Sequence, residues 1–181
     1  MGIPSESMLP SIRINDTVWI NRLAYGFGLY WQPFALVQWS QPSLGDIIVF
    51  KPQAKMRAPR YSYLIKRVVG LPGDVVEVHE QRLSINGVLI RYASPSTRLQ
   101  AREFLCNAKK HDVLLSGDTF SEFGPYKVPL GHVFVMGDNR GMSDDSRDWG
   151  AVNIGTIEGR AVFLLRTQTL GKEHFPQLEL L

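Results

Sequence analysis

The sequence predicts an all-β protein, built mainly of antiparallel sheets with few short helices. Val, Ile and aromatic residues occur in short runs, which is typical of strands. Gly, Pro, Asn and Asp interrupt these runs at close intervals, as expected for the turns that join strands. The 3.6-residue spacing of apolar side chains that marks an amphipathic helix is weak throughout the chain.

The strands expected from these runs are, in chain order, residues 17–21, 46–51, 63–69, 75–79, 83–85, 88–91, 132–136 and 159–165. The runs at 46–51 and 132–136 each begin directly after a glycine, where a turn can end. Asn86-Gly87 separates two adjacent runs and is the best short hairpin signal in the chain.

At 181 residues the chain is expected to form one domain with an excursion. Residues 1–74 and 127–166 hold the sharper motifs and are predicted to form the catalytic core. The Gly-punctuated, mixed polar segment 75–126 predicts an inserted β excursion, a smaller subdomain, in which 94–107 is expected to be a short helix or irregular. Residues 167–181 carry no motif and are expected to form a loosely held C-terminal tail.

The composition excludes several classes of protein. With 44% apolar and 20% charged residues, the chain is typical of a globular protein. Its net charge of +3 comes without a basic stripe or stacking aromatic motif, so we expect no nucleic-acid binding. Cys106 is the single cysteine, which excludes an intrachain disulfide and a Cys-rich zinc site. We expect neither a metal ion nor an organic cofactor.

The segment from Leu23 to Trp39 is unusually apolar for one that Gly and Pro interrupt. Trp19, Trp31 and Trp39 suit a bilayer interface, because the indole ring is apolar and its N–H is polar. Two interpretations stay open, since these side chains could equally fill the core. No run reaches the ~18 apolar residues of a membrane-spanning helix.

Familiar catalytic signatures are absent from the sequence, including Gly-x-Ser-x-Gly and His-Glu-x-x-His. Ser7 instead lies in Ile-Pro-Ser-Glu-Ser-Met-Leu-Pro-Ser, where Pro4 and Pro10 restrict the backbone on both sides. A serine in such a rigid turn can present its hydroxyl to a substrate. By itself the pattern is also compatible with a structural turn.

Lys66 lies within the apolar run Tyr-Leu-Ile-Lys-Arg-Val-Val. A strand of this composition is expected to be buried on at least one face. Burial lowers the pKa of a lysine and makes it a usable general base near neutral pH. The alternative is an ordinary lysine whose amine reaches solvent.

A dense polar loop, Gly-Asp-Asn-Arg-Gly-Met-Ser-Asp-Asp-Ser-Arg-Asp-Trp-Gly, occupies residues 137–150. Asp145 and Arg147 are expected to form an ion pair that fixes its shape, while Ser143 offers a hydroxyl. As a calcium site the loop is poor, because the spacing of an EF-hand is absent.

Four blocks together resemble the successive sequence boxes of the bacterial type I signal peptidases. They are Ser-x-Ser-Met-x-Pro, Gly-Asp-Ile-x-Val-Phe, Lys-Arg-Val-x-Gly-x-Pro-Gly-Asp and the loop at 137–150, in the family's order over residues 3–163. The resemblance implies a serine endopeptidase in which Ser7 is the nucleophile and Lys66 the general base. The sequence departs from the family's usual pattern at Glu6 and at Gly141-Met142.

The resemblance also assigns supporting roles. Ser5 and the Ser7 backbone N–H would form the oxyanion hole, and Ser143 would hydrogen-bond and orient Lys66. The loop that places Ser143 would be held by Asp138, Asp145 and Arg147. Shallow substrate pockets would be lined by Ile3, Pro4, Leu9, Leu64 and Ile65.

The implied substrates are exported preproteins, cut after small residues in an Ala-x-Ala pattern. Family members carry N-terminal transmembrane helices, so we expect this chain to be a soluble truncation without its anchor. Its catalytic domain would lie on the outer or periplasmic face of the cytoplasmic membrane, with residues near Leu23 to Trp39 touching lipid.

Two other kinds of function stay open at this stage. One is another Ser-Lys peptidase, such as a self-cleaving repressor or a conjugative-transfer processing enzyme. The other is a catalytically inactive module that binds the membrane surface.

Overall fold

A computed structural model describes residues 1–27, 37–54, 56, 63–80, 82–93, 100–105, 110–115, 122–170 and 173–181, with the backbone alone at 27, 167–170 and 173–176. The Cys106 position and residues 28–36, which include Trp31, lie outside the described residues.

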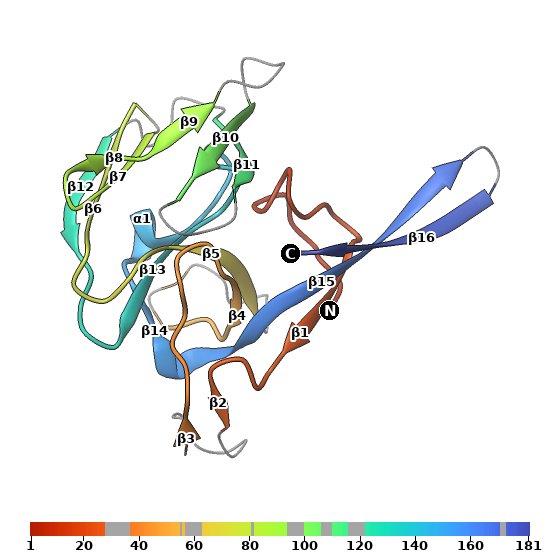
Figure 1. Ribbon diagram of the computed structural model, residues 1–181, viewed down its shortest axis with the longest axis horizontal. Coiled ribbons are helices and arrows are strands. Elements are labelled where there is room, and N and C mark those ends of the chain that lie inside the picture. The colour runs from red at the N-terminus through yellow and green to blue at the C-terminus, as the bar shows by residue number, and fades with distance from the viewer. Residues whose placement is uncertain are drawn as a thin grey trace.

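The predicted all-β class is confirmed (Figure 1). The strands of the described residues are β1 (Thr17–Asn21), β2 (Gly26–Phe27), β3 (Val37–Gln38), β4 (Ile47–Phe50), β5 (Leu64–Gly70), β6 (Val75–His79), β7 (Arg82–Ile85), β8 (Val88–Leu89), β9 (Arg91–Ala93), β10 (Gln100–Phe104), β11 (His111–Leu114), β12 (Glu122–Lys127), β13 (His132–Met136), β14 (Val152–Asn153), β15 (Ile157–Leu170) and β16 (Glu173–Leu180). They are joined by one short helix, α1 (Ser146–Trp149), and one 3-10 turn, η1 (Ile154–Thr156). Every predicted strand coincides with at least one of these.

The largest sheet has the order β1-β15-β4-β5-β13-β14, and β16 also pairs with β15. Its pairings are antiparallel. Strands β4 and β5 lie at its centre and are almost wholly buried, as expected for runs such as Ile-Ile-Val-Phe. The sheet thus brings the lysine strand into the middle of the protein.

Segment 75–126 forms two smaller sheets, β12-β6-β7-β8 and β11-β10-β9, which lie together at one side of the molecule (Figure 1). The predicted hairpin turn is confirmed, since Asn86 and Gly87 both have positive φ angles and join β7 to β8. One hydrophobic cluster combines residues of this segment, such as Val76 and Leu83, with Val69 and Phe134 of the main sheet. The division into core and subdomain stays a prediction.

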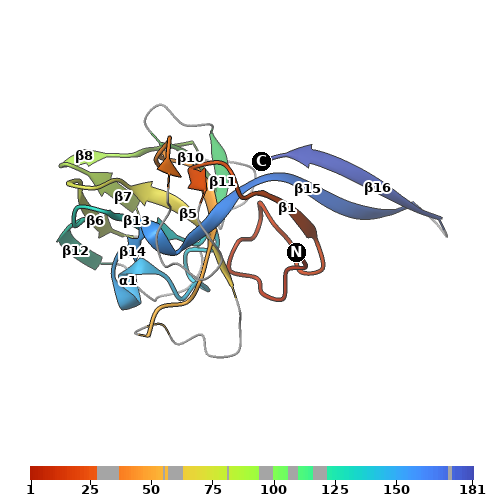
Figure 2. The ribbon, with the colours of Figure 1, turned by 90° about the horizontal axis from the view of Figure 1, so that it is seen from below.

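Two local predictions differ from the structure. Residues 100–104, expected to be helical or irregular, form β10, because they pair with both β9 and β11. Residues 173–180 of the expected loose tail form β16, which pairs with β15 along its whole length. The β15–β16 hairpin extends away from the remaining strands (Figures 1 and 2).

The N-terminal segment packs on one face of the main sheet. Ile3, Met8 and Ile12 are at most 3% exposed and share a hydrophobic cluster with Ile47 and Val49 of β4. Ile48 and Phe50, which alternate with these, belong to a separate cluster. Because neighbouring strand residues point to opposite faces, both faces of the sheet are covered. The cluster around Met8 anchors the segment that carries Ser7.

Candidate active site

Ser7 is held in a compact loop above the central strands. Met8 beside it is fully buried, and the Ile12 N–H donates to the Met8 carbonyl at 2.9 Å. At the two ends of the loop, the Ile3 N–H donates to the Asp16 carbonyl at 3.2 Å. The Ser7 side chain therefore has a defined position although the loop contains no regular strand.

Lys66 reaches Ser7 from the middle of β5. Its backbone is opposite Ile48 of β4, and the residue is 4% exposed. Lys66 Nζ lies 2.7 Å from Ser7 Oγ, a short hydrogen-bond distance. The structure thus brings together two predicted residues that are 59 positions apart in the sequence.

Burial lowers the pKa of Lys66 from 10.5 to about 8. Desolvation is the main cause, because an ammonium loses more hydration free energy than a neutral amine on burial. Asp145, Asp144 and Asp138 act in the opposite direction, and they keep the pKa from falling further. A substantial fraction of Lys66 is therefore neutral near pH 8, where its lone pair can accept a proton.

A second hydroxyl lies beside the pair. Ser5 Oγ is 3.3 Å from Ser7 Oγ, and Ser5 is partly exposed whereas Ser7 is 7% exposed. The arrangement allows Ser5 to donate a hydrogen bond to an oxygen bound near Ser7.

The loop after β13 packs directly against the Ser7 backbone. The Asn139 N–H donates to the Ser7 carbonyl at 3.1 Å, and Asn139 Nδ2 donates to the Glu6 carbonyl at 3.2 Å. Gly137 lies so close that a Cβ at this position would overlap both the Ser7 carbonyl oxygen and Ser143 Oγ. A glycine is required there because only its bare Cα leaves room for both groups.

The expected ion pair of Asp145 and Arg147 is present. Arg147 Nε and Nη2 each lie 2.8 Å from an Asp145 oxygen, and both side chains are almost completely buried. Asp145 also caps α1 and accepts from the Gly137 N–H at 3.0 Å. Burial would raise the pKa of Asp145, but its bonds with Arg147 and the Arg147 charge outweigh burial and lower it.

Ser143 is 7% exposed and lies beside Gly137. Its hydroxyl contributes to the lowered pKa of Asp145. Among the described residues, however, Ser143 Oγ has no hydrogen-bond partner of ordinary geometry, Lys66 included. The expected bond between Ser143 and Lys66 is therefore not made in this structure.

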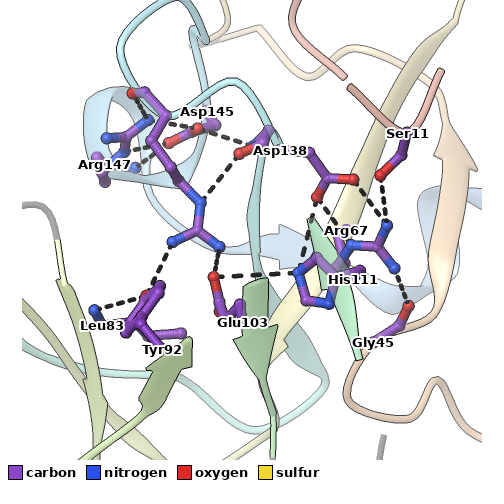
Figure 3. A network of polar contacts seen from close by, with 12 residues as sticks. Ser11, Gly45, Arg67, Leu83, Tyr92, Glu103, His111, Asp138, Asp145 and Arg147 are labelled. Carbon is purple, nitrogen blue, oxygen red and sulfur yellow. Dashed lines mark hydrogen bonds and ion pairs between the residues drawn. The ribbon is translucent and has the colours of Figure 1, made fainter. Parts of the chain in front are cut away.

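Asp138 pairs with Arg67, the residue after the candidate base. The Arg67 guanidinium donates to both Asp138 oxygens, at 2.7 and 2.8 Å, and also bonds Ser11 Oγ and the Gly45 carbonyl (Figure 3). Burial would raise the pKa of Asp138, but the charge and hydrogen bonds of Arg67 lower it. The ion pair ties the loop after β13 to β5 and to the segment that follows Ser7.

The five apolar residues predicted to line substrate pockets do not form one group. Ile3 and Ile65 are buried in the cluster that also contains Met8. Leu64 packs against the cluster that contains Ile48 and Phe50. Pro4 is exposed, and Leu9 is partly buried. Of this set, Ile3 and Ile65 lie in the packing environment of the Ser7 segment.

Sequence reasoning missed several contacts of the site. It identified Arg67, Asn139 and Arg140 only as parts of motifs, without a partner. Glu103 of β10 was missed altogether, since its segment has no local signal of function and was expected to be helical or irregular. Among the described residues, no group of three or more His, Cys, Asp or Glu side chains is arranged to hold a metal ion.

A buried lysine within hydrogen-bond distance of a serine, on an antiparallel β fold, defines a candidate serine–lysine hydrolytic site. The chain matches the signal peptidase, peptidase S26 family over residues 1–166, and it belongs to this family. It is 37% identical over 161 residues to "Signal peptidase I" of Pseudomonas fluorescens, covering 84% of this chain and 55% of the relative.

Two further relatives are similar over most of this chain. The chain is 35% identical to "Signal peptidase I" of Leptolyngbya laminosa, covering 88% of this chain and 64% of the relative. It is 33% identical to "Thylakoidal processing peptidase 1, chloroplastic" of Arabidopsis thaliana, covering 90% and 40% respectively. The chain thus spans about 40 to 64% of the length of these relatives.

Proposed function

We propose that the protein is a serine endopeptidase that removes N-terminal signal peptides from preproteins, with Ser7 as nucleophile and Lys66 as general base. The single observation that carries the proposal is the 2.7 Å contact of Ser7 Oγ with a lysine amine that is 4% exposed. The names of the relatives support the choice of signal peptides as substrate.

In this mechanism neutral Lys66 accepts the Ser7 proton while Oγ attacks the carbonyl carbon of the scissile bond. The tetrahedral intermediate collapses as the C–N bond breaks, and the Lys66 ammonium gives its proton to the leaving amine. An acyl ester of Ser7 remains. A water then attacks the ester while Lys66 takes the water's proton, which returns to Ser7 Oγ when the acid product leaves.

The oxyanion of the tetrahedral intermediate would accept hydrogen bonds from the Ser7 N–H and the Ser5 hydroxyl. The closeness of Ser5 Oγ to Ser7 Oγ supports this role. Loss of one such donor costs about 2.7 to 4 kcal/mol of transition-state stabilisation.

The polar loop at residues 137–150 would keep Ser7 and Lys66 at hydrogen-bond distance from each other. Asp145 with Arg147 shapes the loop, and Asp138 with Arg67 joins it to β5. Ser143, buried beside Gly137, would orient Lys66 through its hydroxyl, which makes no hydrogen bond of ordinary geometry among the described residues.

Substrates would be cut after small residues in an Ala-x-Ala pattern. Ile3 and Ile65 belong to the cluster that supports the Ser7 segment, and Pro4, Leu9 and Leu64 would complete shallow pockets that exclude large side chains. Steric exclusion of this kind discriminates strongly, because a packed wall yields only at the cost of strain.

We further propose that the protein acts at the outer or periplasmic face of the cytoplasmic membrane. Trp19, Phe163 and Leu180 lie in register on β1, β15 and β16 and are 59%, 38% and 67% exposed. Leu23 and Trp39 add exposed apolar surface. Exposed apolar rows of this kind mark surfaces that contact membranes or other proteins, and we assign this row to the membrane. No helix of the described residues is long and apolar enough to cross a bilayer.

The test is cleavage of a preprotein with a natural signal peptide, analysed by mass spectrometry. Wild-type protein is expected to cut once, after a small residue. Ser7→Ala and Lys66→Ala should each abolish cutting while remaining folded. Full activity in either variant would refute the mechanism, and an intact preprotein with wild-type protein would leave a binding module as the better description.

A further inference from the structure

A fully buried ion pair lies outside the proposed Ser7–Lys66 pair. Arg140, from the loop after β13, is 1% exposed, and Glu103, from β10, is fully buried. Arg140 Nη2 bonds Glu103 Oε2, and Arg140 Nη1 donates to the Tyr92 hydroxyl of β9 at 3.3 Å. Both partners of Arg140 come from the small sheet β11-β10-β9.

The Arg140 guanidinium also acts on the loop beside Ser7. Its Nε donates to the Gly137 carbonyl at 3.1 Å. Gly137 in turn lies against the Ser7 carbonyl and Ser143, as the overlap of an added Cβ shows. A chain of direct contacts therefore runs from Glu103 through Arg140 and Gly137 to Ser7.

The same sheet holds the loop at a second point. The Leu114 N–H of β11 donates to the Asp138 carbonyl at 2.8 Å, and the Arg140 N–H donates to the Leu114 carbonyl at 2.9 Å. Asn139, between these two residues, binds the Ser7 carbonyl through its N–H. The backbone bonds with Leu114 fix the position of the loop. The Arg140 side chain fixes the orientation of the Gly137 peptide group.

Stability alone gives a weak reason for this pair. The cost of desolvating a buried carboxylate and guanidinium often exceeds their attraction, and apolar residues of similar size frequently serve as well. Glu103 Oε1 moreover has no hydrogen-bond partner among the described residues. The hydrogen bond from Arg140 to the Gly137 carbonyl explains the pair better.

We propose that Glu103 is a positioning residue for the Ser7–Lys66 site and acts through Arg140 on the Gly137 peptide. This inference rests on the proposed function. It gives segment 75–126 a role in the reaction, because β9 and β10 would supply the groups that keep the loop at the distance from Ser7 that hydrolysis needs. A displacement of ~1 Å at a reacting group can cost about 100-fold in rate.

The experiment measures kcat and KM for cleavage of a signal-peptide substrate by Glu103→Gln, Glu103→Asp and Tyr92→Phe. The matched control is Asp112→Asn, which breaks the exposed Arg102–Asp112 pair of the same sheet, with Nε and Oδ1 2.7 Å apart. Glu103→Gln should lower kcat by about 10- to 100-fold with little change in KM. Glu103→Asp should recover part of this loss, and Asp112→Asn should match wild type.

A double variant, Glu103→Leu with Arg140→Met, separates positioning from folding. It replaces the buried pair with apolar side chains and is expected to stay folded, yet it lacks the bond to Gly137 and should remain slow. Thermal unfolding is followed for every variant. A folded Glu103→Gln or a folded double variant with wild-type kcat overturns the proposal. If neither folds, an unchanged kcat for Tyr92→Phe overturns it, and a several-fold fall supports it.

Wild-type protein and Ser7→Ala are run in the same assay. If wild-type protein fails to cleave, or Ser7→Ala cleaves equally well, the proposed function itself has failed. If both behave as expected while the Glu103 variants match Asp112→Asn, only the positioning role has failed.

Discussion

Lys66 shows how a single residue trades stability for reactivity. Its ammonium would lose hydration at this site, and the resulting fall of the pKa to about 8 is what makes the neutral amine available. The carboxylates nearby limit the fall, so the site holds a base that is only partly deprotonated at neutral pH. The pKa of Lys66 therefore affects both the activity and the stability of the protein.

The first effect concerns activity as a function of pH. Because the proposed mechanism needs neutral Lys66, kcat/KM should rise with increasing pH and reach half of its maximum near pH 8. Asp144 raises the pKa of Lys66, so Asp144→Asn should move this limb to lower pH. A profile that falls as pH rises through 8 would contradict the role of Lys66 as base.

The second effect concerns stability. The folded-state pKa lies below the ordinary value of 10.5, so the unfolded chain binds more protons between about pH 8 and 10.5. Stability should therefore rise with pH across this window, by about 3 kcal/mol from Lys66 alone. Lys66→Met should be inactive but more stable than wild type at pH 7, and denaturant titrations should find that the gain shrinks toward pH 10.5.

The close packing around Gly137 predicts that no larger residue is tolerated at this position. Gly137→Ala forces a methyl group into the Ser7 carbonyl and Ser143, and should destabilise the protein by about 1 to 3 kcal/mol. Activity should fall further than stability does, because the Ser7 backbone must move. Gly2→Ala, whose Cβ would meet nothing within 4 Å, is the matched control and should be neutral in both unfolding and cleavage assays.

At the scale of elements, the loop between β13 and α1 connects the strands on which the site depends. Arg67 of β5 and Arg147 at α1 each neutralise a buried aspartate of the loop, and β11 pairs with it at Leu114. Two buried ion pairs and a backbone bridge therefore hold this loop from several directions.

Asp138→Asn tests this role. It leaves the Arg67 guanidinium buried without its counter-charge, and we expect a loss of about 3 to 5 kcal/mol in the free energy of unfolding. The control is Glu158→Gln, which removes an ion pair with the 49% exposed Lys51 side chain and should cost about 0 to 1 kcal/mol. If urea titrations gave both variants the same loss in free energy of unfolding, burial of the Asp138–Arg67 pair would not be the cause of its stabilising effect.

Considered as a whole, the molecule has an exposed apolar row on the same sheet that carries Lys66. Cross-strand partners have side chains on the same sheet face, so Trp19, Phe163 and Leu180 form one continuous strip. Strand β8, with exposed Val88, and strand β1 lie on opposite sides of strands β4 and β5 (Figure 1).

The proposed lipid contact predicts a difference between these two surfaces. The double variant Trp19→Ser with Leu180→Ser should weaken binding to phospholipid vesicles by about tenfold or more, since the apolar transfer free energy of both side chains is lost. Val88→Ser should bind vesicles as wild type does. Co-sedimentation measures both, and indistinguishable binding by all three proteins would exclude contact through the strip.

By itself the sequence determined the all-β class, the eight strand positions, the Asn86-Gly87 turn and the pairing of Asp145 with Arg147. Each of these depends on residues a few positions apart, where β-propensity, turn geometry and local hydrogen bonding act directly. Ser7 and Lys66 were identified through motif resemblance, and only the fold shows that they touch.

Other features were decided by tertiary structure alone. Strand β16 lacks a strong local pattern and forms because β15 offers a partner, and β10 is a strand because β9 and β11 flank it. The Arg140–Glu103 pair joins residues 37 positions apart, and the pKa of Lys66 depends on how completely the sheet and the N-terminal segment exclude water. Contacts of this kind are set by long-range packing, so no local window of the sequence contains them.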